Sequence, residues 1–350
     1  MNSNATIGMD LGDKRHTVCV LDSAGEVLLR KEIVNTKASL VKFFKRYNGS
    51  LVVVEAGTHS PWISRELDVL GCKVLVGNAR KLRAIWAAED KSDVHDAEML
   101  ARIARVDRHL LYPIHHRGLE AQQDLAILKA RDSLVSVRSL MVNHVRSAVK
   151  SVGCRIKKCS TDSFARQAME SIPEGLLPAL KPVLQEIGTI TARIRAYDKQ
   201  IKALIDERHP DAKRLSQVPG VGPVTSLGFV LSLEDASRFK KSRAVGAYLG
   251  MTAKRDQSGQ TDKQLHITKA GDEFLRRLLV GCTHYILGSF APDSELRQFG
   301  LKLAMRGGKN AKRRAVVAVA RKLSVLLHRL WVTGEEYDPE YQKNKGRKAA

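Results

Sequence analysis

Apolar and polar positions alternate over the first part of the chain. Three strand-like stretches fall within residues 5–34, with turn signals at 11–13 and 22–25 between them. A short helix is expected over 38–47, followed by the apolar run 51–54 of a buried strand. A helix over 61–70, another strand and helical periodicity to about residue 106 complete an α/β pattern.

Residues 119–209 have a different pattern, which predicts two long helices on either side of the turn-rich stretch 151–178. In the second helix, apolar residues recur at spacings of three and four, as is typical of a coiled coil. The two series are Leu180, Ile187, Ile194, Ile201 and Val183, Ile190, Tyr197, Leu204. Two interpretations remain open: the helices pack on each other within one chain, or they form a dimerisation arm.

From about residue 213 a third, mainly α-helical domain is expected. The sequence Pro-Gly-Val-Gly-Pro joins two helical runs and resembles a helix-hairpin-helix, in which Gly220 and Gly222 would let the turn approach a DNA phosphate. The alternative is an ordinary turn between helices. A basic segment, two further helices and a polar tail from Gly334, expected to be disordered, follow.

These patterns predict four segments. They are an RNase H-like domain over 1–112, a helical coiled-coil segment over 113–212, a C-terminal domain over 213–335 and a tail over 336–350. In the RNase H-like fold three strands precede the first helix, and the remaining strands and helices alternate, as they do here.

The net charge of +22 favours a polyanionic partner, with nucleic acid the first candidate. Residues 1–110 hold 17 Lys+Arg and 14 Asp+Glu, whereas the remainder holds 42 and 23. The binding surface is therefore expected downstream of the first domain. Neither a signal peptide nor a membrane span is evident, and the five scattered cysteines form no zinc pattern, so a soluble intracellular protein with reduced thiols is expected.

Four acidic residues in the first domain suggest a metal site. Asp10 ends the first strand and Glu55 ends the fourth, and these strands are neighbours in an RNase H-like sheet. Asp93 and Asp96 are three residues apart, so they lie on one face of a helix. Such a cluster needs cations to offset its repulsion, and Mg²⁺ or Mn²⁺ suits a set of oxygen ligands.

Each acid also has a purely structural interpretation. Asp10 could end a strand, Asp93 could be an N-cap, and Asp96 could be a first-turn acid that favours the helix dipole. Glu55 is harder to explain, because a carboxylate directly after three valines is costly to bury without a partner. The opening IGMDLG also resembles the phosphate-binding segment of sugar kinases and actin-like ATPases, but their later Asp-rich and Gly-rich motifs are not found.

A serine in the last domain is a candidate nucleophile. Ser258 precedes Gly259 in what is expected to be a polar loop. Such a serine is usually only solvated, but the basic residues around it could hold a phosphodiester beside its hydroxyl. These residues are Lys254, Arg255, Lys263, Lys269, Arg276 and Arg277.

Six segments together resemble the DEDD transposases of the IS110 and IS1111 insertion sequences, which are bridge-RNA-guided recombinases. The segments are IGMDLGDKRHTV, VVVEAGTHSPW, KSDVHDAEMLA, PGVGPVTS, AYLGMTAKRDQSG and ITKAGDEFLRRLL. The resemblance covers nearly the whole chain. Met-Thr-Ala-Lys in place of Leu-Thr-Pro, and Thr268 in place of a serine, are small departures outside the candidate catalytic positions.

The resemblance implies a RuvC-like domain, a coiled-coil linker and a transposase domain. It implies that Asp10, Glu55, Asp93 and Asp96 bind Mg²⁺ and that Ser258 forms a covalent phosphoserine link to DNA. It also implies a structured guide RNA that pairs with donor and target DNA. Self-association as a dimer or tetramer through the coiled coil is expected, in a cytoplasmic, nucleoid-associated protein. Whether acids and serine meet within one chain or between chains is left open.

Two other functions remain as alternatives. One is a metal-only nuclease of the Holliday-junction resolvase type, with water as the nucleophile. The other is a non-catalytic nucleic-acid binder.

Overall fold

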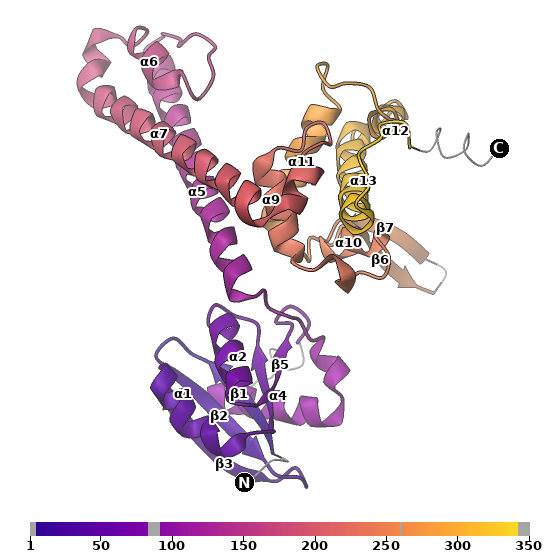
Figure 1. Ribbon diagram of the computed structural model, residues 1–350. Helices are drawn as coiled ribbons and strands as arrows, with labels where there is room; N and C mark the ends of the chain where they lie inside the picture. The colour runs from indigo at the N-terminus through magenta and orange to yellow at the C-terminus, as the bar shows by residue number, and fades with distance from the viewer. Residues whose placement is uncertain (1–4, 83–91, 260, 342–350) are drawn as a thin grey trace, which may run out of the picture. The chain divides into compact units, whose positions relative to one another are not determined.

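The computed structural model describes residues 5–82, 92–259 and 261–341, and the chain divides into two compact units, 1–117 and 118–350. The first unit is a mixed α/β structure and the second is mostly helical, as predicted (Figure 1). The finer division into four segments and the RNase H-like classification stay predictions.

The first unit is built on a five-stranded sheet in the order β3-β2-β1-β4-β5. Its strands are β1 (Thr6–Leu11), β2 (Arg15–Leu21), β3 (Val27–Val34), β4 (Leu51–Glu55) and β5 (Lys73–Gly77). β2 is antiparallel to both β1 and β3, whereas β4 is parallel to β1 and β5. The predicted pairing of the first and fourth strands is therefore confirmed.

Helices cover both faces of the sheet. α1 (Lys37–Phe44), η1 (Lys45–Tyr47) and α2 (Ser60–Val69) pack on the face that holds Met9 and Val54. α4 (Asp93–Val106), followed by η2 (Arg108–Leu111), packs on the face that holds Cys19 and Val53. Because successive strand residues point to opposite faces, each strand contributes to both cores. Residues 83–91 of the predicted helical stretch lie outside the described residues.

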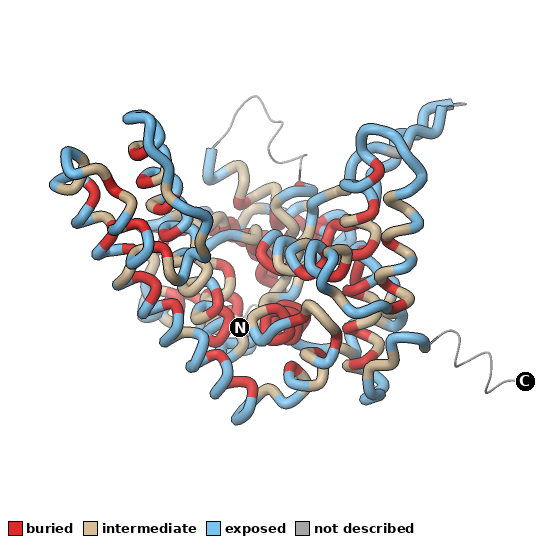
Figure 2. The backbone as a smooth tube through the Cα atoms, turned by 90° about the horizontal axis from the view of Figure 1, so that it is seen from above, coloured by how far each residue is buried: buried red, intermediate tan, exposed pale blue. Residues whose placement is uncertain are grey.

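In the second unit, α5 (Leu119–Ser151) and α7 (Leu177–Arg208) pack on each other as a hairpin, with α6 (Phe164–Met169) and η3 (Glu174–Leu176) between them in sequence (Figure 1). The first apolar series predicted for α7 is buried. Figure 2 shows buried and exposed positions alternating along the helices. The two helices thus pack within one chain, and a coiled coil between chains stays a prediction.

The helical body of the second unit encloses the largest apolar core. Its helices are α8 (Pro210–Leu215), α9 (Pro223–Leu233), η4 (Ala236–Arg238), α10 (Arg243–Tyr248), α11 (Glu273–Ile286), α12 (Glu295–Ala304) and α13 (Ala311–Thr333). An antiparallel pair, β6 (Ala253–Ser258) and β7 (Thr261–Ile267), interrupts them. The sequence pattern did not predict this pair, because its strands carry mostly polar residues.

The prediction that the tail from Gly334 is disordered is wrong for its first residues. Tyr337 is half-buried against the apolar core, and its backbone N–H donates to Gln217 Oε1 at 3.1 Å. The carbonyl of Pro339 accepts from Glu295 N at 3.0 Å. Apolar packing and backbone hydrogen bonds therefore hold this segment on the body, while residues 342–350 lie outside the described part.

In the part of the chain that the structure describes, no helix combines the length and the apolar composition needed to cross a bilayer.

Candidate active site

Asp10 and Glu55 come from the same end of two neighbouring strands. Parallel pairing of β1 with β4 places Met9 opposite Val54, and Asp10 and Glu55 are the next residues on the two strands. By strand alternation, Asp10 shares a face with Gly8, and Glu55 shares that face with Val53. This is the face that α4 covers.

The direction of α4 brings its first turn to the same end of the sheet. Arg102 and Arg105, late in α4, donate to the carbonyls of Gly25 and Asp22 in the turn after β2. That turn lies at the end of the sheet where β1 begins, because Leu21 pairs with Thr6. The first turn of α4 therefore lies towards the opposite end, where β1 ends at Leu11.

Ser92 begins α4, because its hydroxyl accepts from the N–H of His95 at 3.2 Å. The interpretation of Asp93 as the N-cap is therefore wrong, and Asp93 and Asp96 are both first-turn acids. Asp93 is exposed and Asp96 is half-buried. With Asp10 and Glu55 they form a set of acids at one end of the sheet, here called the carboxylate quartet.

One oxygen of the quartet is unusual. Asp96 Oδ1 is buried, and no group among the described residues donates a hydrogen bond to it. A buried oxygen without a donor is costly, and a hard cation is a suitable partner for it. However, no three His, Cys, Asp or Glu side chains among the described residues lie close enough together to hold a metal ion. The carboxylate oxygens of the quartet suit a divalent cation, but in this structure they are not gathered around one position.

An ion-pair network fixes the position of α4 on the sheet. Glu98 accepts from Arg30 of β3 at 2.6 Å and from Arg102 one turn further along α4 at 2.7 Å. These hydrogen bonds hold the pKa of the Glu98 carboxyl below its ordinary value, although burial opposes them. Glu98 thus links α4 to the edge strand of the sheet and supports the placement of the quartet.

Two further residues shape this site, and neither was predicted from the sequence. Gly8 is the point at which β1 and α4 approach each other, since a β carbon there would lie 2.7 Å from the backbone nitrogen of Ala101. Ser92 caps the helix that carries two of the acids. A serine just before the first helical residue was a usable signal for the cap. No sequence signal identifies Gly8.

The sequence predicted Ser258 in a polar loop, whereas in the structure it is the last residue of strand β6. Its side chain is exposed, it pairs with Thr261 of β7, and Gly259 follows with φ +55. Nearby Arg255 is in an ion pair with Asp262 at 2.7 Å, whereas Lys254 and Lys263 are exposed. The hairpin therefore presents the hydroxyl to solvent with Lys254 and Lys263 nearby, on a strand face that it shares with the carboxylate of Asp256.

The other predicted nucleic-acid contacts lie in or before α11. Arg276 donates to the carbonyls of Leu249 and Gly271 at 3.0 and 3.2 Å, which joins the start of α11 to the preceding loops. Arg277 forms an ion pair with Asp132 of α5. Lys269 has a left-handed backbone, φ +53. The two arginines thus have structural contacts, and a role in nucleic-acid binding stays a prediction for all three.

The two glycines of the α8–α9 turn differ. Gly220 has φ +87, and a β carbon there would lie 2.8 Å from the Tyr285 ring, so internal packing against α11 requires this glycine. Gly222, the N-cap of α9, has open space where a side chain would lie. Gly222 therefore leaves open space in which a phosphate could approach, and the helix-hairpin-helix stays a prediction.

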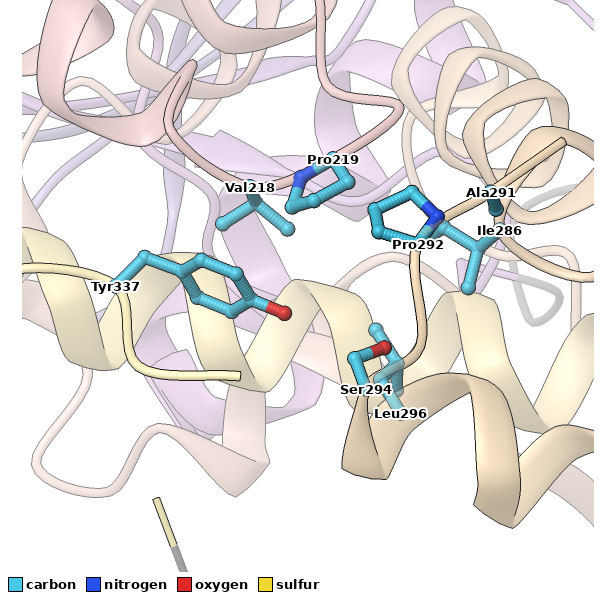
Figure 3. Close-up of a pocket in the computed structure, with 8 residues that line it drawn as sticks. All are labelled: Val218, Pro219, Ile286, Ala291, Pro292, Ser294, Leu296 and Tyr337. Carbon is cyan, nitrogen blue, oxygen red and sulfur yellow. The ribbon is translucent and has the colours of Figure 1, made fainter. Parts of the chain in front are cut away.

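A crevice beside this turn is not a substrate site. It is lined by Val218, Pro219, Ile286, Ala291, Pro292, Ser294, Leu296 and Tyr337 and has a volume of ≈ 10 Å³ (Figure 3). That volume holds at most one water molecule. Burial raises the pKa of the Tyr337 phenol, as expected for a ring packed into a core.

Comparison with known proteins identifies the chain. A model of the transposase IS116/IS110/IS902 family matches residues 212–298, and a DEDD transposase model matches residues 7–153. The transposase of insertion sequence element IS1111A from Coxiella burnetii is 26% identical over 95% of this chain and 90% of its own length. A probable family 20 transposase from Pseudomonas aeruginosa is 28% identical, covering 92% and 95%. The IS1328 transposase of Yersinia enterocolitica is 26% identical, covering 79% and 82%. The chain belongs to the IS110 family of insertion-sequence transposases, enzymes that cleave and rejoin DNA.

Proposed function

We propose that this transposase cleaves DNA at the carboxylate quartet with the help of Mg²⁺ or Mn²⁺. The observation that carries the proposal is the position of Asp10 and Glu55, side by side at the end of β1 and β4 on the face that α4 covers. Asp93 and Asp96 start that helix, and the DEDD transposase match spans all four acids. A bound divalent cation would stabilise the charge of the entering and leaving oxygens of the scissile phosphate.

Ser258 is the proposed nucleophile. Its Oγ forms a bond to the phosphorus, its proton passes to a base, and the bond from phosphorus to the displaced sugar oxygen breaks. That oxygen keeps the electron pair and takes a proton. The product is a covalent phosphoserine link, and rejoining reverses the step with a sugar hydroxyl from another DNA end. Exposure of Ser258 at the end of β6, with Lys254 and Lys263 nearby, supports this role.

Sequence choice is assigned to a structured guide RNA that pairs with donor and target DNA. This part of the proposal rests on the resemblance of the motifs to bridge-RNA-guided recombinases. The charge of +22 supports binding of such a polyanion. Base pairing would then select the sites, while protein contacts bind backbone and shape, as in other RNA-guided systems.

The test is a cleavage assay with donor DNA, target DNA and the cognate RNA, compared for wild type, Ser258→Ala and Asp10→Asn. Ser258→Ala should lose the protein–DNA adduct that denaturing gels detect, and Asp10→Asn should lose both cleavage and adduct. Ser237→Ala, in the same unit, serves as the matched control and should retain both. Rescue of a crippled quartet variant by Mn²⁺ in place of Mg²⁺ would further support metal chemistry.

The possible outcomes separate the candidate functions. Adduct formation by Ser258→Ala rules out this nucleophile. Cleavage without any protein–DNA bond in the wild type would instead favour a metal-only nuclease with water as the nucleophile. Full activity of Asp10→Asn rules out the metal site as proposed.

Self-association as a dimer or tetramer is part of the same proposal. α5 exposes Leu140 at 71% and Val137 at 47%, which is unusual for apolar residues on a helix that already packs against α7. A second copy would cover these side chains. Light scattering should show the wild type as an oligomer and Leu140→Lys as a smaller species. Equal masses would argue against this surface.

A further inference from the structure

The tip of the α5–α7 hairpin carries an open cleft that the proposed function does not use. It has a volume of ≈ 410 Å³ and is lined by Arg146, Lys150, Gly153, Cys154, Arg155 and Ile156. α5 ends at Ser151, and the chain turns at Gly153, which has φ +80. Figure 1 shows this end of the hairpin, near α6, away from the helical body that holds α9 and α11.

The cleft is strongly cationic. No Asp or Glu occurs between Asp132 and Asp162, whereas five basic residues stand between positions 146 and 158. They are Arg146, Lys150, Arg155, Lys157 and Lys158, and no ion pair with any other described residue neutralises them. The C-terminal dipole of α5 contributes only about half a negative charge here. The net potential at the tip is therefore positive.

Arg146 gives the cleft a defined shape. Its guanidinium donates to the carbonyl of Ile156 at 3.4 Å and to Cys159 Sγ at 3.7 Å. The same group lies 4.9 Å from the centre of the Phe164 ring. Arg146 thus holds the loop 153–159 against the end of α5, so that Lys150 of the helix and Arg155 of the loop line one cleft. A long, unanchored basic loop would not keep these charges together.

We infer that this cleft binds the phosphodiester backbone of a nucleic-acid strand at a distance from the reacting linkage. Lysine and arginine side chains without acidic partners suit phosphate, and the cleft has room for a phosphate and its sugar. α5, with 33 residues, is about 50 Å long, so the tip contacts the strand well away from Ser258. Such contacts bind without base selectivity. The inference rests on the proposed function only in that the ligand is a nucleic acid.

Binding of a labelled DNA duplex to the full chain, measured by fluorescence anisotropy at several salt concentrations, tests this inference. All proteins carry Ser258→Ala and the buffer contains EDTA, so that no DNA is cleaved and the measured affinity does not depend on the proposed catalytic site. Lys150→Gln with Arg155→Gln should weaken binding roughly tenfold or more at 0.1 M salt and reduce the slope of log affinity against log salt by about 1.8. Lys199→Gln with Lys202→Gln, two exposed lysines on α7, should change neither. An unlabelled RNA duplex as competitor distinguishes RNA from DNA as the tighter ligand.

Cys154 offers a second readout within the native sequence. It is exposed and lines the cleft, whereas Cys19, Cys72 and Cys282 are buried. Maleimide labelling of Cys154, followed by peptide mass spectrometry, should slow severalfold when the duplex is bound. The double cleft variant should lose that protection. An unchanged salt slope in the variant, or an unchanged rate for Cys154 in the wild-type complex, would overturn the inference.

Discussion

Gly8 of β1 and Ala97 of α4 are in such close contact that a β carbon at Gly8 would stand 1.9 Å from the Ala97 carbonyl oxygen. Only a glycine permits this approach of helix to sheet. Asp10 lies two residues beyond Gly8, and Asp96 immediately precedes Ala97. The same contact that packs the helix therefore sets the separation between the two halves of the carboxylate quartet.

The first prediction is that Gly8→Ala impairs both stability and catalysis. A β carbon forces α4 away from β1, and such overpacking costs about 1–3 kcal/mol of unfolding free energy. Because Asp93 and Asp96 move with α4, DNA cleavage should fall by about tenfold or more, as expected when catalytic groups are misplaced. Gly281→Ala is the control, since a β carbon there meets nothing within 4 Å. Cleavage by Gly8→Ala at the wild-type rate would show that the position of α4 is unimportant.

The second prediction concerns metal binding without reference to activity. Mg²⁺ or Mn²⁺ should raise the melting temperature of the wild type, because a ligand of the folded state at a hundred times its Kd adds about 2.7 kcal/mol of stability. Asp96→Asn should abolish this metal-dependent rise in melting temperature. In EDTA the variant should be about as stable as the wild type, because Asp96 Oδ1 accepts no hydrogen bond from the described residues that the substitution could remove.

Asp107→Asn, at the other end of α4, is the matched control for the metal titration. Asp107 caps η2, and asparagine is an equally good cap. It should keep the full metal-dependent shift. A metal response that survives Asp96→Asn would remove Asp96 from the proposed ligands.

The third prediction is a pH dependence that Glu98 contributes. Hydrogen bonds from Arg30 and Arg102 hold its folded pKa below the ordinary value of 4.5. Its stabilising contribution, about 1 kcal/mol for such a network, is therefore complete above pH 4.5 and is lost as the pH falls through the folded pKa. Glu98→Gln should melt earlier than wild type at pH 7, and the difference should shrink below pH 4.5. Glu26→Gln, an exposed position outside the ion pairs of the described residues, should show no such convergence.

The fourth prediction separates structural from nucleic-acid-binding roles among the basic residues of the second unit. Arg276→Ala leaves the carbonyls of Leu249 and Gly271 without their charged donor and should cost about 1.5–3 kcal/mol of stability. Lys254→Ala with Lys263→Ala should leave the unfolding transition in place and weaken duplex binding instead. Denaturant unfolding and anisotropy on the same samples check both outcomes. A stable Arg276→Ala with weakened binding would make Arg276 a nucleic-acid contact after all.

The sequence by itself determined the strands of the first unit, the two long helices of the second and the positions of the acids along the chain. Apolar alternation specified the strands, the strand and helix order predicted that β1 and β4 are neighbours, and spacing placed Asp93 and Asp96 on one helical face. These features are local or follow from topology, so periodicity is sufficient to reveal them. The hairpin of β6 and β7 was not predicted, because its mostly polar strands lack the alternation of apolar and polar residues.

Only the tertiary structure decided which residues already have contacts within the fold. Arg276 and Gly220 are predicted nucleic-acid contacts, and the structure adds that Arg276 donates to backbone carbonyls and that Gly220 packs against α11. The cleft at Lys150 and Arg155 arises because Arg146 holds the loop that follows α5 against the end of the helix, a contact that the apolar and polar pattern does not indicate. Hydrogen bonds and close packing depend on three-dimensional proximity, whereas charge and periodicity can be read along the chain.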